Sequence, residues 1–244
     1  MRKLFTFFTY LLRQLGFKPK KTFVRISQQP SPSAPHVPKL RRKIENTGVK
    51  PNISQDEKVD EFIPFEKIAE VIRRSFLHLP PNAERGLRQV YEALKRHEVS
   101  DIGYIAYILA TAWHETNQTM LPVKEAYFIG EPRASRYREK LPYYPYYGRG
   151  FAQITQRANY ERFSELLDVD LVDNPDLALE PDIASDILVI GMLKGFSPGA
   201  PVLEDFMRGK YPDWHSARKI VNGTDSAKLI AIYAARIYDG LRYG

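Results

Sequence analysis

The sequence predicts a mainly α-helical domain with at most one short β-hairpin, and three observations lead to this fold class. Apolar residues recur at helical spacing through most of the chain after residue 56. Proline and glycine residues divide these stretches into segments of helical length. A strand pattern is confined to residues 151–155, where we expect the hairpin. The chain has 244 residues, 43% of them hydrophobic, and can bury the core of one domain.

The helices are justified by apolar spacing and by the residues that stop them. Asn82 can cap the helix that follows the proline pair 80–81, and Ser226 can cap the last helix. Leu229 is assigned to the buried face of that last helix. The expected helices span residues 57–76, 83–96, 102–115, 159–167, 181–194, 214–221 and 227–241, with a turn at 174–178 and a loop at 196–213.

The N-terminal region differs from the rest of the chain in charge. Residues 1–50 hold 12 basic side chains and one acidic side chain, Glu45, which leaves 24 of the 36 basic and 28 of the 29 acidic side chains for the remainder. Since a nucleic-acid-binding domain carries its positive charge on the folded surface, we expect no nucleic acid partner. The basic segment instead favours attraction to an anionic membrane or to lipopolysaccharide.

Residues 1–17 begin like a signal sequence, yet the nine uncharged residues 4–12 are too few to span a bilayer. No small-residue cleavage site follows them. We expect an amphipathic or hydrophobic segment, and an export signal, a membrane-surface helix and a disordered end all remain open. Residues 18–55 contain six prolines among basic and polar residues, which predicts a disordered linker before a domain at 56–244.

The segment 102–116 is the core of the predicted domain. Its apolar residues lie at the spacing of one buried helical face, and the helix ends at His114 and Glu115. Glu115 falls on the flank of that face, so we expect it to be half-buried. Burial and the negative end of the helix dipole both disfavour a charged carboxylate there. A carboxyl group kept protonated is what a general acid needs near neutral pH.

A second glutamate and a tyrosine-rich run follow this helix. Glu125 comes ten residues after Glu115, beyond a bend imposed by Pro122. Residues 143–147 then contain four tyrosines, and two glycines flank Arg149 directly after them. This run is too polar for a core and too aromatic for an ordinary loop.

Four strings in order resemble the glycoside hydrolase family 19 chitinases and the related phage and prophage endolysins. They are Trp-His-Glu-Thr at 113–116, Tyr-Tyr-Gly-Arg-Gly-Phe-Ala-Gln-Ile-Thr at 146–155 with Asn-Tyr at 159–160, Asp-Asn-Pro-Asp-Leu at 173–177 and Arg-Lys-Ile-Val-Asn-Gly at 218–223. The resemblance covers roughly residues 60–243 and implies a lysozyme-like bilobal helical fold with the sugar cleft between the lobes and any hairpin beside it.

The resemblance also implies an inverting hydrolysis of β-1,4 bonds next to N-acetylhexosamines. Glu115 is the implied general acid and Glu125 the implied base, with their carboxyl groups roughly 6.5 to 9.5 Å apart to admit a water molecule. Thr155 matches a Ser/Thr that helps to hold that water. The plant enzymes carry the second glutamate on a longer loop with disulfides, whereas the interval here is short and cysteine-free, as in the bacterial and phage branch.

The resemblance assigns sugar binding to residues of the same strings, namely His114, Tyr147, Arg149, Gln153, Asn159 and Asn222. For Arg149 the alternative is a buried ion pair that organises the cleft. Tyrosines 143, 144, 146 and 147 can either pack between the lobes or stack on sugar rings.

The leading interpretation is a peptidoglycan-cleaving enzyme of the endolysin or muramidase type, and chitin is the alternative substrate. A third hypothesis is a non-hydrolytic carbohydrate-binding or virion structural protein, which the presence of Glu115, Glu125, Thr155 and Asn222 together disfavours. We expect a monomer that acts in the bacterial cell envelope, in the periplasm or outside the cell. The absence of cysteine excludes a thiol nucleophile and thiolate metal sites, and no cofactor or metal is expected.

Overall fold

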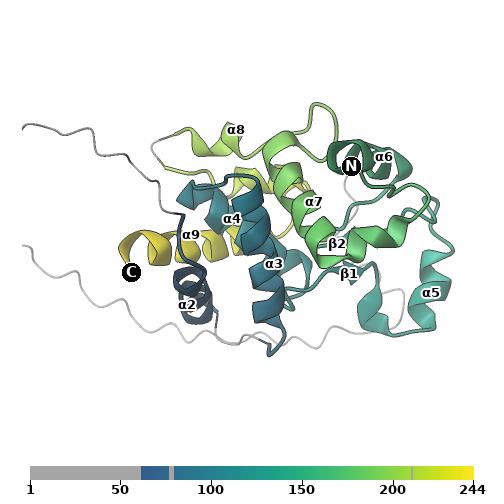
Figure 1. Cartoon of the computed structure of the whole chain (residues 1–244), viewed down its shortest axis with the longest axis horizontal. Coiled ribbons are helices and arrows are strands. Elements are labelled where there is room, and N and C mark those ends of the chain that lie inside the picture. Colours follow the sequence, from purple (N-terminus) through teal and green to yellow (C-terminus); the bar gives the residue numbers. More distant parts are fainter. Residues whose placement is uncertain (1–61, 77–79, 210) are drawn as a thin grey trace, which may run out of the picture. The chain divides into compact units, whose positions relative to one another are not determined.

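The computed structural model describes residues 62–76, 80–209 and 211–244 (Figure 1). These residues form eight α-helices, three 3-10 helices and one sheet of two short strands. The mainly helical fold class is thereby confirmed, and it agrees with a lysozyme-like helical domain. The predictions for residues 1–17 and 18–55, and for the start of the domain at residue 56, lie outside the described residues.

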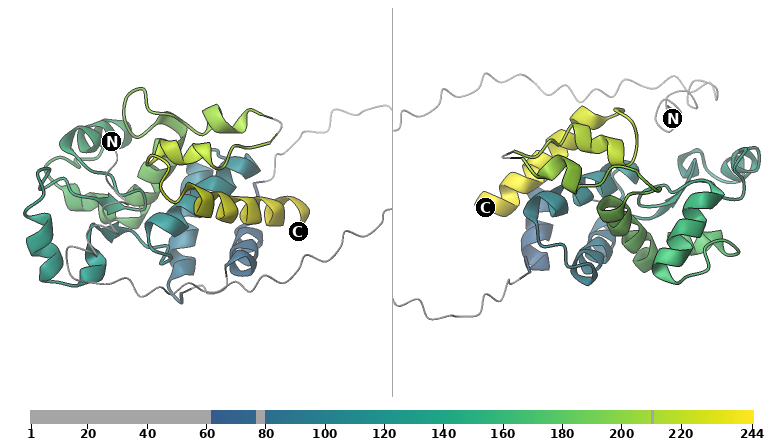
Figure 2. Two further views of the ribbon diagram at one scale, coloured as in Figure 1. Left: turned by 180° about the vertical axis from the view of Figure 1, so that it is seen from behind. Right: turned by 90° about the horizontal axis from the view of Figure 1, so that it is seen from above.

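Helix α4 (Ile102–Glu115) forms the centre of the core and packs mainly against α9 (Ala227–Tyr243), the yellow C-terminal helix in Figure 2. The bounds of α4 are as predicted, and Asp101 caps it by accepting a hydrogen bond from the backbone N–H of Tyr104 at 2.9 Å. The prediction that α4 is buried on one face only is wrong, because more of its surface is buried than expected. Residues 105–113 are all buried, because α3, α7 and α9 all pack against the helix.

Helices α2 (Phe65–Ser75) and α3 (Ala83–Arg96) complete the first hydrophobic cluster. Helix α3 has the predicted bounds, but Asn82 makes no side-chain capping bond, so that part of the prediction is wrong. Phe76 stacks on Trp113 with ring centroids 4.3 Å apart. α2 approaches α9 closely, since a Cβ on Gly240 would lie 2.7 Å from a methyl group of Val71.

Helix α7 (Pro181–Lys194) contributes residues to two hydrophobic clusters. In Figure 1 it stands between the central helices and the part of the chain with β1 and β2. One face, with Leu188 and Met192, belongs to the first cluster. The other face, with Ile187 and Ile190, packs with residues from α6 (Arg157–Leu167) and from the 3-10 helix η2 (Pro175–Leu179). α7 therefore joins the central helices to the part of the chain that carries the sheet.

The sheet differs from the predicted hairpin. Strand β1 (Val123–Lys124) pairs antiparallel with β2 (Arg149–Gly150), in the register Val123 with Gly150 and Lys124 with Arg149. The residues expected as a hairpin contribute one isolated bridge, from Ile154 to Arg149. The pairing thus joins the segment after Glu115 to the glycine-flanked arginine, which sequence spacing did not predict.

Short elements and one face of α9 were also mispredicted. The 3-10 helix η1 (Tyr127–Ile129) and helices α5 (Arg133–Arg138) and α8 (Glu204–Met207) were not expected, and the predicted helix at 214–221 is the 3-10 helix η3 (Ser216–Ile220). Leu229 is 41% exposed, because the buried stripe of α9 runs through Ile230, Ala234 and Ile237. Ser226 makes no side-chain cap. In the described part of the chain no helix is long and apolar enough to cross a membrane.

Candidate active site

Glu115 is the last residue of α4, and its carboxylate forms an ion pair with Arg218. The Glu115 side chain is 13% exposed and the Arg218 side chain 1% exposed. Arg218 lies on η3, and its Nε also donates to the backbone carbonyl of Asp225 at 2.9 Å. The guanidinium is therefore fixed at two points, and it orients the carboxylate of Glu115.

The groups around this ion pair are buried and polar. Burial lowers the pKa of His114, and the positive charge of Arg218 acts in the same direction. Burial also raises the pKa of Asp225. The sequence-based expectation of a protonated Glu115 stays a prediction, and the fold adds Arg218, which sequence spacing did not place beside this carboxyl group.

Glu125 lies directly after β1 and is 7% exposed. Its Oε1 accepts a hydrogen bond from the hydroxyl of Tyr143 at 3.0 Å, and its Oε2 accepts one from the backbone N–H of Gly148 at 2.9 Å. Its own backbone N–H donates to the Gly148 carbonyl at 2.7 Å, and Arg138 donates to its carbonyl at 3.1 Å. Burial raises the pKa of Glu125, and these hydrogen bonds from Gly148 and Tyr143 only partly oppose it.

Gly148 and Gly150, on either side of Arg149, let the backbone of this segment lie close to its neighbours. A Cβ on Gly148 would lie 2.8 Å from Oε1 of Gln153 and 3.4 Å from the Glu125 side chain. Gly150 has a φ of +83°, and a Cβ there would lie 2.9 Å from the Ala178 carbonyl oxygen. A larger residue at Gly150 would therefore clash with the backbone at Ala178, and one at Gly148 would displace the Gln153 side chain that lies beside Glu125.

Arg149 is 3% exposed and pairs with Asp176, with Nε 2.7 Å from Oδ1. Its Nη1 donates to the Pro145 carbonyl at 2.9 Å, to the Tyr147 carbonyl at 3.2 Å and to the Tyr160 hydroxyl at 2.9 Å. The structure thus places Arg149 in a buried network rather than at a surface open to sugar. Tyr147 is also buried, with its ring 3.6 Å from the Arg149 guanidinium carbon.

Two further candidates for sugar contacts, Gln153 and Asn159, use their side-chain amides for hydrogen bonds within the protein. Gln153 donates to the carbonyls of Val123 at 2.7 Å and Gly150 at 3.0 Å, so it ties β1 to the arginine turn. Asn159 donates to the carbonyl of Thr155 at 2.9 Å. Thr155 itself is half-buried on the same turn.

The candidates therefore gather in two groups. His114, Glu115 and Asn222 lie at the end of α4 and after η3, where Asn222 accepts a hydrogen bond from the backbone N–H of Gly223 at 2.9 Å. The candidates from 125 to 159 lie around Glu125 and the arginine turn. The hydroxyl of Tyr127 donates to the Thr116 carbonyl at 3.3 Å and so links the residue after Glu115 to the segment of Glu125.

Sequence reasoning missed several residues that hold the two glutamates, chiefly Arg218, Tyr143 and Arg138. Arg218 and Tyr143 lay within strings that the sequence singled out, but nothing in the sequence paired them with a glutamate. Among the described residues, no group of three or more His, Asp or Glu side chains could hold a metal ion.

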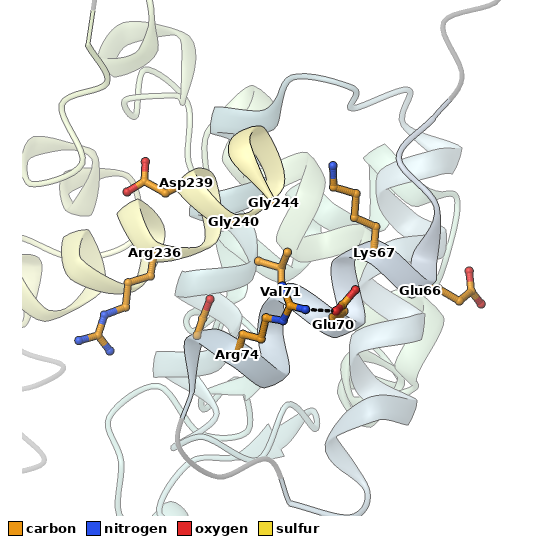
Figure 3. Close-up of a pocket in the computed structure, with 10 residues that line it drawn as sticks. Glu66, Lys67, Glu70, Val71, Arg74, Arg236, Asp239, Gly240 and Gly244 are labelled. Carbon is orange, nitrogen blue, oxygen red and sulfur yellow. Dashed lines mark ion pairs between the residues drawn. The ribbon is translucent and has the colours of Figure 1, made fainter. Parts of the chain in front are cut away.

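A pocket of about 670 Å³ lies between α2 and α9 (Figure 3). It is lined by three acidic and three basic side chains, namely Glu66, Glu70, Asp239, Lys67, Arg74 and Arg236. These charges balance, so the pocket selects no ligand by charge. None of its lining residues belongs to the segments that hold the two glutamates.

A comparison with known proteins gives a partial relationship. The chain is similar to Chitinase 11 of Oryza sativa subsp. japonica, with 32% identity over 121 aligned positions that cover 41% of this chain and 47% of the rice protein. The chain thus matches about half the length of that relative. No protein-family model and no solved structure matches the chain. The similarity supports a chitinase-like, glycoside hydrolase relationship, whereas the endolysin and phage relationship stays a prediction.

Proposed function

We propose that the protein is a glycoside hydrolase that cleaves β-1,4 bonds of N-acetylhexosamine polymers by acid/base catalysis with inversion. One observation carries the proposal. Two glutamates from adjoining segments are each held in a shielded position by partners of their own, Glu115 by Arg218 and Glu125 by Tyr143 and Gly148. A protein that only binds glycan has no need of two carboxyl groups fixed in this way.

In this mechanism Glu125 is the base that activates water. Its raised pKa makes the carboxylate a stronger proton acceptor than an ordinary surface glutamate. The hydrogen bonds from Tyr143 and Gly148 orient both oxygens, and Thr155, on the turn that includes Gly148, helps to hold the water.

Glu115 is the acid that protonates the leaving sugar oxygen. The ion pair with Arg218 holds its carboxyl group in place at the end of α4. Arg218 keeps its second contact with the Asp225 carbonyl and remains next to the carboxyl group after proton transfer. There it stabilises the carboxylate that the donation of the proton produces.

Peptidoglycan is the substrate that we propose first. Residues 1–50 carry a net charge of +11, from 12 basic side chains and Glu45, which would hold the enzyme on an anionic bacterial envelope through its membrane or lipopolysaccharide. Chitin is an uncharged polymer and gives such a segment nothing to bind. This places the proposed activity in cell-wall lysis of the endolysin or muramidase type, in the bacterial envelope, with the export route left open.

Chitin is the second candidate substrate, and the similarity to the rice protein named Chitinase 11 favours it. Both substrates present N-acetylhexosamines in β-1,4 linkage, so the same two glutamates serve either reaction. The difference must lie in the contacts to the lactyl and peptide groups of peptidoglycan, which chitin lacks.

The decisive experiment compares two assays on the same preparations. Loss of turbidity of outer-membrane-permeabilised bacteria is measured beside cleavage of N-acetylglucosamine oligomers, with wild type, Glu115→Gln and Glu125→Gln. Glu161→Gln is the matched control, since Glu161 is an exposed partner of Arg157. Cleavage of chitin oligomers alone would reject peptidoglycan. If wild type and Glu115→Gln cleave equally little while both bind glycan, the protein is a binding module.

A further inference from the structure

Six large apolar or aromatic residues are exposed on the described part of the chain, namely Tyr144, Leu166, Tyr211, Leu229, Ile232 and Tyr243. Tyr144, at 52% exposure, is the one that adjoins a candidate catalytic group. Its neighbour Tyr143 donates a hydrogen bond to Glu125 at 3.0 Å. Since consecutive Cα atoms are about 3.8 Å apart, the backbone of Tyr144 lies one residue from the contact with the candidate base.

The ring of Tyr144 rests on a rigid support. It is stacked on Tyr147, with ring centroids 6.3 Å apart and planes 27° from parallel. Tyr147 is 7% exposed, and its ring lies 3.6 Å from the guanidinium carbon of Arg149, which the ion pair with Asp176 fixes. Tyr144 is thus the exposed end of a column whose other two members are buried.

The backbone around Tyr144 is equally constrained. Its N–H donates to the Leu141 carbonyl at 3.0 Å, and the N–H of Tyr146 donates to the Tyr143 carbonyl at 2.7 Å. Pro142 and Pro145 flank the turn and limit its backbone freedom. A ring held in this way loses little conformational freedom when it binds a ligand.

We propose that Tyr144 is a stacking platform for one pyranose ring of the polymer, on the Glu125 side of the site. The inference rests on the proposed function for the nature of the ligand. A pyranose ring turns C–H groups to its faces and hydroxyl groups to its rim, so a flat aromatic surface covers the faces while the rim stays hydrated. The exposed ring is that of Tyr144, whereas Tyr147, to which the resemblance assigned sugar binding, is buried.

The ring of Tyr144 contacts the pyranose ring of a sugar and does not depend on the charge of that sugar. Its effect is therefore a preference for longer oligomers. Oligomers long enough to reach Tyr144 from the candidate base gain the contact, and shorter ones do not. The same contact serves N-acetylglucosamine and N-acetylmuramic acid, because both have the pyranose ring.

The test measures binding and turnover separately in the full-length protein. In a Glu115→Gln background, Kd for short and long N-acetylglucosamine oligomers is measured by calorimetry for Tyr144→Ala, Tyr144→Phe and Tyr144→Trp. We expect Tyr144→Ala to weaken binding of long oligomers about tenfold, equal to about 1.4 kcal/mol. The Phe and Trp variants keep a ring and should bind long oligomers like the parent. Tyr243→Ala, at a 75% exposed tyrosine in the last turn of α9, is the matched control.

With Glu115 intact, Tyr144→Ala should raise KM for long oligomers more than it changes kcat. If wild type cleaves glycan and Tyr144→Ala binds long oligomers as tightly as its parent, the platform is wrong while the proposed function stands. If no variant cleaves but Tyr144→Ala still binds more weakly, the platform stands and the hydrolase proposal fails. If the parent binds no oligomer, the platform is overturned as well.

Discussion

Arg218 and Glu115 lie 103 residues apart in the chain and form an ion pair at the end of the central helix α4. The arginine side chain is 1% exposed, so its charge is shielded from water and depends on the glutamate for compensation. This contact joins η3 to α4, and it fixes the position of the proposed general acid.

Arg218→Met should destabilise the protein strongly at neutral pH. Removal of one partner of a buried ion pair costs about 3–5 kcal/mol, and we expect about 3 kcal/mol because Glu115 keeps some contact with water. The measurement is urea unfolding followed by circular dichroism. Adding Glu115→Gln should restore part of the loss, since it removes the charge left without a partner.

Arg157→Met is the control for this experiment. Arg157 pairs with Glu161 on the surface, with 62% of its side chain exposed, and loss of such a pair costs less than about 1 kcal/mol. Equal unfolding midpoints for Arg218→Met and wild type would show that the ion pair does not support the fold.

Tyr143→Phe should shift the acidic limb of the pH profile. The Tyr143 hydroxyl donates to Glu125 and stabilises its ionised form, which lowers a pKa that burial has raised. Without that bond the pKa of Glu125 rises further, and a base must be ionised to act. The acidic limb of kcat/KM should therefore move to higher pH, while the plateau changes less.

Tyr146→Phe serves as its control, because the Tyr146 hydroxyl donates to the Val172 carbonyl at 3.3 Å and not to Glu125. Its acidic limb should stay in place. A shift of the Tyr143→Phe limb to lower pH contradicts the assignment of Glu125 as the base.

Asp176→Asn should lower the melting temperature in a pH-dependent way. Burial acts to raise the pKa of Asp176, but the hydrogen bonds and charges of Lys124 and Arg149 outweigh it and lower that pKa. A carboxylate whose pKa is lowered in the folded state stabilises the fold at pH values above the ordinary aspartate pKa of about 3.9. This contribution is lost as the pH falls through the pKa of Asp176 in the folded protein.

The melting temperatures of Asp176→Asn and wild type should therefore differ at neutral pH and converge in strong acid. Lys124→Met, which leaves Arg149 paired, should show a smaller difference. A gap between Asp176→Asn and wild type that stays constant down to strong acid would mean that the ion pairs are not its source.

The elements that could be predicted from the sequence are those with a long apolar period. The bounds of α3 and α4 follow from their apolar residues directly, because α3 buries a stripe of several turns and α4 is buried on all sides from residue 105 to 113. Helices α5 and α8 have six and four residues, too few for a period to emerge. β1 pairs with β2 across the 24 intervening positions 125–148, and no local pattern encodes that pairing.

The candidate site shows the same division between local and long-range information. The two glutamates were identified from their own surroundings in the chain, a helix end and a bend. Their partners Arg218 and Tyr143 were visible as residue types in unusual strings, but a hydrogen bond or ion pair depends on where the fold brings two segments together. The pairing of Glu115 with Arg218 went unpredicted for this reason, since the two residues lie 103 positions apart in the chain.

Removal of residues 1–50 should leave folding intact and weaken attachment to anionic membranes. The segment carries 12 basic residues and has no pattern that would form a core. Full-length and truncated protein are compared by sedimentation with vesicles that contain anionic lipid and with neutral vesicles. Binding of the full-length chain should fall as salt is added, because the Debye length is only about 10 Å at 0.1 M. Equal binding by both forms would reject the role of the segment.

The two glutamates should fail differently when each is replaced by glutamine. Glu115 must deliver a proton to the leaving sugar oxygen, which glutamine cannot do, so Glu115→Gln should reduce kcat by several orders of magnitude. Its fold should persist with some loss of stability, because the charge of Arg218 then faces a neutral amide.

Glu125→Gln should instead leave measurable activity, since water can still enter and Thr155 can still hold it. A glutamine can keep both hydrogen bonds at position 125 if its oxygen faces Gly148 and its amide donates to the Tyr143 hydroxyl.

Because burial disfavours the charge of Glu125, Glu125→Gln should also melt at a higher temperature than wild type at neutral pH. A glutamate whose pKa is raised in the folded state destabilises the fold only at pH values above its pKa in the unfolded chain, about 4.3. The higher melting temperature of the variant should therefore disappear in acid. The acidic limb of the activity profile should disappear in Glu125→Gln while the alkaline limb remains. Should the variant keep both limbs and near-wild-type turnover, the base is another group and Glu125 has a structural role.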